Sequence, residues 1–294
     1  MTFCFLGCVG AAAEHESLGD RAYAELRFGD ALAEYRLSSV RDGADPALNA
    51  KLASAALHAG DLVAAAQAYV ALAERGDNSR LMQAADGLER VAQAAVEVGD
   101  REALTAALVG LRRIAPRRAV GTLAQPLARE VAGGPPSVAA LSVLTYAAAV
   151  APDARLLDSL MYASAVVLRQ LGRCEEAVPV LESLVRRERE PAVVDAARAS
   201  AGYCAYTLGR ESHDQSLPLS AEQWYRRAIA SAGTTAYGRA AYLGLGDVLF
   251  ARADYVGAAE AYESAMFGAA PTDSIAQEAA AKLNMLGRAG TGIP

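Results

Sequence analysis

Apolar and small residues recur at helical spacing along most of the chain, and short polar breaks divide them into paired segments. The clearest pair covers residues 242–265, where the polar break is residues 252–254. Residues three and four apart in sequence share one face of a helix. The pattern therefore predicts two antiparallel helices joined by a short turn, with small residues on the faces that meet.

The small residues of this pair follow a known order. Leu245 and Gly246 lie in the first helix, and Ala258, Tyr262 and Ala265 share one face of the second. This set resembles the tetratricopeptide repeat (TPR), which has Leu-Gly in its first helix and an Ala, an aromatic residue and an Ala on its second. Gly inside a helix costs about 1 kcal/mol relative to Ala. Its presence indicates a neighbouring helix that must come close.

A spacing of twelve residues between two small residues recurs along the chain and predicts seven helical pairs. In the second and third pairs, Gly60 and Gly99 each precede an Asp in the turn. Gly tolerates positive φ there, and Asp can cap the next helix. The seven pairs of positions, first helix and then second, are Gly19 and Ala31, Ala53 and Ala65, Ala92 and Leu104, Ala128 and Ala140, Ala165 and Ala177, Gly202 and Ala221, and Gly246 and Ala258.

The sixth pair departs from this spacing. Gly202 and Ala221 lie nineteen residues apart, and the surplus falls in a polar stretch that contains a Pro. We therefore expect an enlarged loop over residues 211–219, which is a second candidate contact site. Beyond Pro271, residues 274–286 predict one amphipathic helix that caps the open end.

The sequence thus predicts an all-α fold, a right-handed α-solenoid of about seven TPR-like helix hairpins plus a C-terminal capping helix. The solenoid covers residues 11–287, and residues 288–294 form a frayed tail. The TPR resemblance implies the handedness and a concave face lined by the first helices. A solenoid also suits the length of 294 residues, because each repeat contacts only its neighbours, whereas a single core of that size usually splits into domains.

Charge and motifs argue against several classes of function. The net charge of -6 lacks the basic excess of a nucleic-acid binder. His15, His58 and His213 fall in different pairs without metal-ligand spacing, and Gly244 and Gly246 form a GxG inside a helix with no strand before it. No apolar run reaches the roughly 18 residues that span a bilayer. We predict that the protein is not an enzyme and uses no cofactor or metal.

The first ten residues, MTFCFLGCVG, contain a cysteine motif. Phe5-Leu6-Gly7-Cys8 resembles the lipobox of bacterial lipoproteins, in which the Cys is lipidated after cleavage. Leu6 stands one place too close to Cys8, and a basic segment with a full apolar stretch is missing. Two interpretations stay open. Residues 1–10 are either a truncated lipoprotein signal, with Cys8 anchoring the protein at the periplasmic side of the cell envelope, or the disordered start of a cytoplasmic protein.

Cys174 and Cys204 lie on consecutive predicted helices. If the chain is exported, the two can form a disulfide. The alternative, which we favour because it is commoner for Cys on helices, is a pair of small buried residues. A Cα separation beyond about 7 Å would exclude the bond.

The candidate binding surface is the face of the first helices, where the TPR resemblance implies contact with an extended peptide or a partner helix. Aromatic and Arg side chains contribute disproportionately to binding energy at interfaces. The alternative is that the tyrosines of this face pack between helical pairs. The predicted partner-binding residues are Arg129, Tyr162, Arg169, Gln170, Tyr203, Tyr206, Asp247 and Phe250.

One binding mode of the TPR family is not carried over to this chain. Some TPR domains hold a C-terminal carboxylate with basic and amide side chains, but here Glu16 and Asp20 occupy the corresponding face of the first pair. We predict a non-catalytic interaction scaffold with a protein or peptide partner, without nucleic acid, and with membrane contact only through a lipid anchor at Cys8. The alternative is a structural component of a cell-envelope assembly that acts through its convex face or self-association.

Overall fold

The structure is a computed structural model that describes residues 7–42, 45–131, 133–233, 235–270 and 272–290, without the side chains of residues 7–11, 41–42 and 288–290. The described residues form fifteen α-helices and no strand, which confirms the all-α prediction. The chain divides into two compact units at residues 160 and 161, inside the ninth helix. Cys8 lies in the first helix, and its side chain is outside the described residues.

Unit 1 holds four helical pairs and the start of the ninth helix. Its helices are α1 (Gly7–Ala24), α2 (Phe28–Asp42), α3 (Pro46–Ala59), α4 (Leu62–Arg75), α5 (Asn78–Val98), α6 (Arg101–Ile114), α7 (Gly121–Glu130) and α8 (Val138–Ala149).

Unit 2 holds the remaining pairs and the predicted C-terminal helix. Its helices are the rest of α9 (Ala154–Gln170), α10 (Cys174–Arg187), α11 (Pro191–Asp214), α12 (Pro218–Ala232), α13 (Ala236–Ala251), α14 (Tyr255–Met266) and α15 (Ser274–Gly290).

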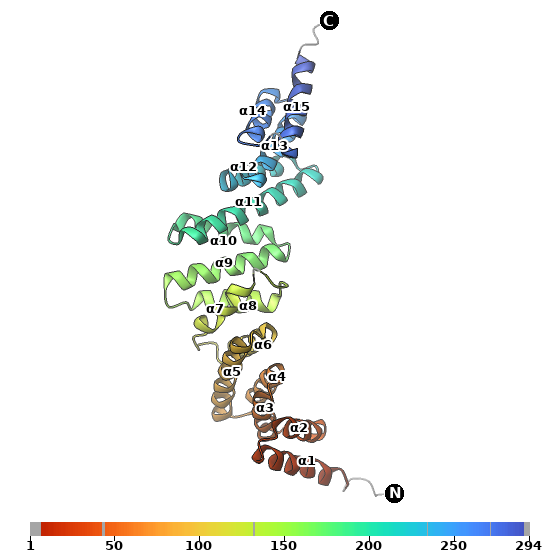
Figure 1. Ribbon diagram of the computed structural model, residues 1–294, viewed down its shortest axis with the longest axis vertical. Helices are drawn as coiled ribbons and strands as arrows, with labels where there is room; N and C mark the ends of the chain where they lie inside the picture. The colour runs from red at the N-terminus through yellow and green to blue at the C-terminus, as the bar shows by residue number, and fades with distance from the viewer. Residues whose placement is uncertain (1–6, 43–44, 132, 234, 271, 291–294) are drawn as a thin grey trace. The chain divides into compact units, whose positions relative to one another are not determined.

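Helices pack in chain order within each unit (Figure 1). We call the odd-numbered helices α1 to α13 the first helices and the even-numbered helices the second helices. Four first helices also approach the next odd-numbered helix: α3 contacts α5, α5 contacts α7, α11 contacts α13, and α13 contacts α15. Packing only against near neighbours is the defining property of a solenoid. Each unit is therefore an α-solenoid of helical pairs, and the right-handed twist stays a prediction.

A Tyr of the second helix packs against a Gly of the first helix in three of the pairs. A Cβ atom on Gly246 would lie 2.4 Å from Cε1 of Tyr262, and one on Gly19 would lie 2.5 Å from Cε1 of Tyr35. Both rings are 2% exposed, so the aromatic ring fills the space that a side chain on the Gly would need. Gly209 and Tyr225 form the third such contact. The close approach predicted at Gly246 is confirmed.

The predicted Gly-Asp turns are also present. Gly60 and Gly99 have φ values of 81° and 73°, in the left-handed region where Gly is favoured. The Asp61 carboxylate accepts a hydrogen bond from the backbone N–H of Ala64 at 3.2 Å, as expected of a helix N-cap. Each of these short turns joins two antiparallel helices of one pair.

The structure corrects the sixth pair. α11 runs unbroken to Asp214, and only residues 215–217 separate it from α12, so the enlarged loop predicted over residues 211–219 is wrong. The small residue of the first helix in this pair is Gly209 and not Gly202. Gly209 lies twelve residues before Ala221 and faces Tyr225. The seven surplus residues lengthen α11 at its N-terminal side instead. Gly202 faces Ala232 of α12.

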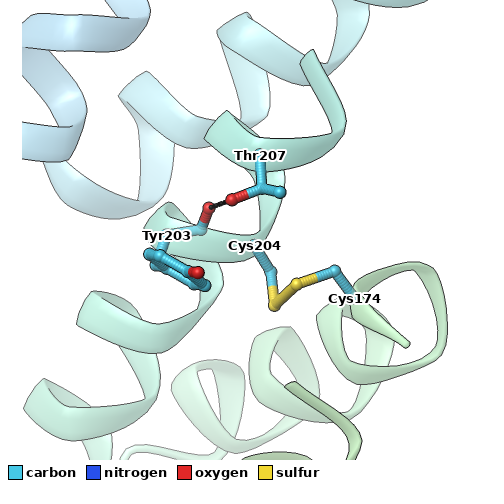
Figure 2. Close-up of a disulfide and its surroundings, with 4 residues drawn as sticks. All are labelled: Cys174, Tyr203, Cys204 and Thr207. Atoms are coloured by element: carbon cyan, nitrogen blue, oxygen red, sulfur yellow. Dashed lines mark hydrogen bonds between the residues drawn. A yellow bond between two sulfur atoms is a disulfide. The ribbon is translucent and has the colours of Figure 1, made fainter. Parts of the chain in front are cut away.

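Cys174 and Cys204 form a disulfide that joins α10 to α11 (Figure 2). Their Cα atoms are 5.0 Å apart, so the favoured interpretation of two unbonded cysteines is wrong, although both residues are buried. The bond closes a 30-residue separation in sequence. In the chain-entropy treatment, a closed loop of this length stabilises the fold by about 3–4 kcal/mol.

Replacing Gly246 with Ala tests the Gly–Tyr contact. We expect Gly246→Ala to lower the free energy of unfolding by about 1–3 kcal/mol, because its Cβ atom would overlap the Tyr262 ring in a packed core. The matched control is Gly29→Ala in α2, whose added Cβ meets nothing within 4 Å. Urea unfolding followed by far-ultraviolet circular dichroism measures both. Equal stability of the two variants would contradict the proposed packing role.

Candidate functional site

Arg169, Tyr203, Tyr206 and Tyr237 form a cluster on three successive first helices, α9, α11 and α13. The Arg169 guanidinium carbon lies 5.6 Å from the Tyr203 ring centroid, within cation–π range. Tyr203 meets Tyr237 edge to face with centroids 5.1 Å apart, and the Tyr206 and Tyr237 centroids are 6.2 Å apart. We call these four residues the tyrosine cluster. The structure thus brings together three of the predicted partner-binding residues.

Tyr237 was missed by the sequence analysis. It lies in the first turn of α13, outside the small-residue positions used to align the pairs, and it is 42% exposed. Tyr203 and Tyr206 are half-buried. Tyr225 of α12 lies behind the cluster, 6.3 Å from Tyr206 between centroids, and its burial raises its pKa. The cluster therefore has a core-facing side and a solvent-facing side.

The disulfide lies directly beside this cluster. Cys204 follows Tyr203 in α11, and Figure 2 shows Tyr203 on the same turns of helix as Cys204 and Thr207. The Thr207 hydroxyl donates to the backbone carbonyl of Tyr203 at 3.0 Å. Cys204 has no exposed surface. The helix that presents Tyr203 is therefore covalently fixed to α10.

Other predicted residues lie apart from these contacts. Tyr162 and Gln170 are half-buried on α9, and the Gln170 side-chain oxygen is buried without a hydrogen-bond partner among the described residues. Arg129 is exposed on α7 and belongs to unit 1. The structure places these three residues without giving any of them a partner-binding role.

Asp247 and Phe250 belong to a different group, at the C-terminal end of unit 2. Asp247 accepts a hydrogen bond from the Tyr262 hydroxyl at 2.9 Å and from the Lys282 ammonium at 2.7 Å. Phe250 is 48% exposed and, together with Met285 and these three polar residues, lines a hollow of about 260 Å³. The lysine comes from α15, so the C-terminal helix completes this site.

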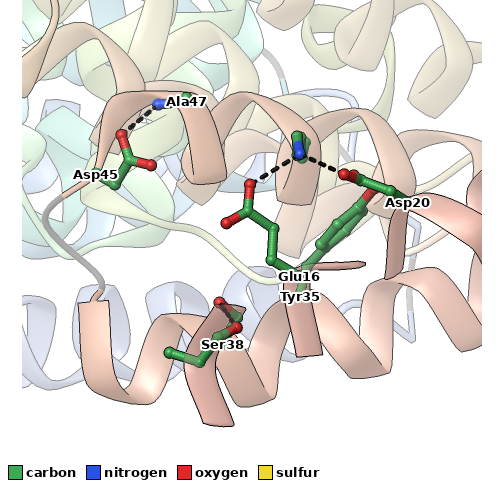
Figure 3. Close-up of polar contacts among 8 residues, drawn as sticks. Glu16, Asp20, Tyr35, Ser38, Asp45 and Ala47 are labelled. Atoms are coloured by element: carbon green, nitrogen blue, oxygen red, sulfur yellow. Dashed lines mark hydrogen bonds and ion pairs between the residues drawn. The ribbon is translucent and has the colours of Figure 1, made fainter. Parts of the chain in front are cut away.

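Unit 1 contains the same arrangement on α1, α2 and α3 (Figure 3). Asp20 accepts from the Tyr35 hydroxyl at 2.8 Å and from the Lys51 ammonium at 2.7 Å, and Lys51 also donates to Glu16 at 2.8 Å. Glu16 and Asp20, for which the carboxylate-binding mode is not carried over, are thus paired with a lysine from the next first helix. Tyr23 and Lys51 line a hollow of about 340 Å³ here.

Burial controls the ionisation of the tyrosines in both groups. Burial raises the pKa of Tyr35 and of Tyr262, and the hydrogen bond that each donates to its Asp raises the pKa further. Burial by itself would lower the pKa of Lys51 and of Lys282, but their hydrogen bonds to carboxylates outweigh it and raise the pKa. All four side chains therefore hold their protons more firmly than in water.

The sequence analysis overlooked both lysines, although a simple signal pointed to them. The chain contains only two lysines, and they are Lys51 and Lys282.

Among the described residues, no three His, Cys, Asp or Glu side chains are placed to hold a metal ion. None of the helices in those same residues is long and apolar enough to cross a membrane.

No protein-family model matches the chain, and no curated protein matches it. Solved structures that match include the TPR domain of P58(IPK), at 15% identity over 96% of this chain and 99% of that one, with a TM-score of 0.27. A tetratricopeptide repeat protein from Parabacteroides merdae ATCC 43184 matches at 15% identity over 94% and 99%, with a TM-score of 0.28. The TPR2AB domain of yeast Sti1, in a complex with pHSP90, matches at 14% identity over 94% and 96%, with a TM-score of 0.29.

Superposition at these TM-scores is too poor to carry an argument, so the assignment of the fold rests on the contacts within each unit. Helical pairs stack in chain order within each unit, and in three of the pairs a Tyr of the second helix fills the space left by a Gly of the first. These are the features that the sequence shares with the TPR pattern. Each unit is therefore an all-α solenoid of stacked helical hairpins.

The protected tyrosines predict a loss of stability at alkaline pH. Because folding raises the pKa of Tyr35 and Tyr262 above the unfolded value of about 10, their contribution is complete below that pH and is lost as pH rises towards the folded value. We expect the free energy of unfolding to fall above pH 10. The fall should be shallower in the Tyr35→Phe, Tyr262→Phe double variant. Urea titrations from pH 8 to 11 measure the slope, and identical slopes would contradict the assignment.

Proposed function

We propose that the protein is a non-catalytic interaction scaffold that binds an extended segment of a partner polypeptide across the first helices of unit 2. The tyrosine cluster is the observation that supports this function. Its residues come from three successive first helices, so that a segment lying across these helices can touch them in turn.

The position of these rings distinguishes them from the structural tyrosines. Tyr35, Tyr225 and Tyr262 each fill the space beside a Gly and are at most 3% exposed. Tyr203 and Tyr237 instead contact each other between neighbouring first helices and keep solvent-accessible surface. Tyrosine offers a large contact area with little conformational entropy to lose on binding, and Arg and Tyr dominate the energetics of interfaces. The cluster therefore has the composition of a binding surface.

Removing the cluster tests this proposal. Affinity capture from the native cell, quantified by mass spectrometry, compares the wild type with the Arg169→Ala, Tyr203→Ala, Tyr206→Ala triple variant. We expect recovery of the specific partner to fall at least about tenfold, since each of two or three such side chains can contribute more than 1 kcal/mol. The control changes two exposed residues on the second helix α12, Gln223→Ala and Arg226→Ala.

Two results would contradict the proposal. One is unchanged recovery by the folded triple variant, and the other is an equal loss in the α12 control. Thermal unfolding of all three proteins shows whether the loss of binding reflects the loss of the fold.

We also propose that the protein works in an oxidising compartment, at the periplasmic side of the cell envelope. The disulfide between Cys174 and Cys204 supports this location, because such bonds persist outside the reducing cytosol. A lipid anchor at Cys8 is part of the same proposal and rests on the lipobox resemblance alone.

Thiol trapping in intact cells checks the location. We expect Cys174 and Cys204 to stay unlabelled by a maleimide until a reductant is added to the denatured protein. The Cys174→Ser variant, denatured without reductant, should show one extra reactive thiol, that of Cys204, which is buried in the folded protein. Mass analysis of the mature N-terminus tests the anchor at Cys8 separately. Full labelling of both cysteines without reductant would argue for the cytoplasm.

A further inference from the structure

Two hollows on the first-helix faces, one in each unit, are lined by equivalent side chains at equivalent positions. Each has an Asp directly after the Gly of the first helix and an aromatic residue three positions later. Each also has the buried Tyr fifteen positions after the Asp, and a Lys from the next helix with another lining residue three positions beyond it. The two sets are Asp20, Tyr23, Tyr35, Lys51 and Ser54 in unit 1, and Asp247, Phe250, Tyr262, Lys282 and Met285 in unit 2. We call them the Asp–Lys hollows.

The recurrence is specific to these two places. The chain has 28 basic residues, and the only two that are lysines stand at equivalent positions in the two hollows. An ammonium group is compact and carries three donors, so it can serve two carboxylates at once, as Lys51 does with Glu16 and Asp20. Lys282 does the same with Asp247 and Glu278. The choice of lysine therefore follows from the geometry of each hollow.

The ion-paired group at each lysine carries a surplus of negative charge. In both cases one ammonium contacts two carboxylates, the Asp that lines the hollow and a Glu beside it, so each group carries a net charge of -1. Among the described lining residues, that lysine is the sole cation. The Asp side chains remain accessible, with 49% exposure at Asp20 and 32% at Asp247. A further cation can approach either carboxylate from solvent.

The remaining walls suit an alkyl chain that carries such a cation. Tyr23 in unit 1 and Phe250 in unit 2 stand one helical turn from the Asp, and Met285 extends the apolar wall in unit 2. Aromatic faces attract ammonium and guanidinium groups, and long basic side chains lay their methylene stems along apolar surface. The hollows, of about 340 and 260 Å³, are each large enough to admit one side chain.

We propose that each Asp–Lys hollow receives one Lys or Arg side chain of the partner polypeptide, with its charged head at the Asp carboxylate and its stem beside the aromatic ring. This inference rests on the proposed function, since it assumes a polypeptide partner on the first-helix face. It adds the chemistry of that partner, which is a basic segment. The negative charge of the whole chain, -6, favours the same class.

Short matched peptides provide the probes. The acetylated and amidated peptide Ala-Arg-Ala-Arg-Ala is titrated into the full-length ¹⁵N-labelled protein, and the backbone amides of Ser54 and Met285 report on the two hollows. The same sequence with Glu or Gln in place of Arg provides the charge controls. We expect saturable shifts at both amides with the Arg peptide only. Preferential binding of the Glu peptide would overturn the inference and would mean that the lysines receive an acidic group.

Removing the Asp charge or the Lys charge should change the affinity for the Arg peptide in opposite directions. Asp20→Asn keeps the hydrogen bond from Tyr35 but removes a charge, so we expect it to weaken binding of the Arg peptide in unit 1 by about two- to fivefold. Lys51→Gln removes the competing ammonium and should strengthen it by a similar factor. In unit 2, Asp247→Asn should likewise weaken binding of the Arg peptide, and Lys282→Gln should strengthen it. Weaker binding in both lysine variants, or the absence of shifts at millimolar peptide, would also overturn the inference.

The peptide test is independent of the partner test. The triple variant Arg169→Ala, Tyr203→Ala, Tyr206→Ala changes no residue that lines either hollow, so it should bind the Arg peptide as the wild type does. If the Arg peptide fails to bind while the triple variant still loses its partner, only the basic-segment inference fails. If the peptide binds as expected while the triple variant keeps its partner, the tyrosine cluster is not the partner site.

Discussion

The contact between a glycine in one helix and a tyrosine ring from the next is the constraint on which this structure depends. Solenoid units have no shared central core, so each pair must bury enough surface by itself and against its neighbours. Alanine supplies little area per residue, and the buried rings of Tyr35 and Tyr262 compensate by lying directly against a backbone that has no Cβ. The hydroxyl of each ring donates a hydrogen bond to an Asp on the first helix, so that the buried ring also contacts a polar side chain at the surface.

Local patterns were enough to predict most of the fold, because solenoid contacts are close in sequence. The twelve-residue spacing and the Gly-Asp turns at Gly60 and Gly99 identified helical pairs that the structure contains. The prediction failed at α11, where it places the small residue at Gly202 although Gly209 keeps the twelve-residue spacing to Ala221, and the packing of Gly209 against Tyr225 confirms that spacing. A polar stretch with a Pro looked like a loop, yet the helix continues to Asp214.

The candidate sites were predicted less completely, because they depend on which side chains meet across helices. Composition favoured Tyr203 and Tyr206 but gave no reason to include Tyr237, which joins them only through the stacking of α11 and α13. Asp247 was expected to face a partner, and its pairing with Lys282 needed knowledge of where α15 packs. The spacing from Asp to Lys differs between the two hollows, 31 residues in unit 1 and 35 in unit 2, so no fixed interval connects them.

The bond between Cys174 and Cys204 also affects how unit 2 would respond to mechanical tension. A solenoid pulled from its ends can unravel pair by pair, but the residues enclosed by a disulfide cannot extend. The enclosed separation is 30 residues, so the fully stretched oxidised chain is shorter than the reduced chain by about 100 Å. α10 and the first half of α11 lie inside this closed segment and would stay together after the neighbouring pairs had peeled away.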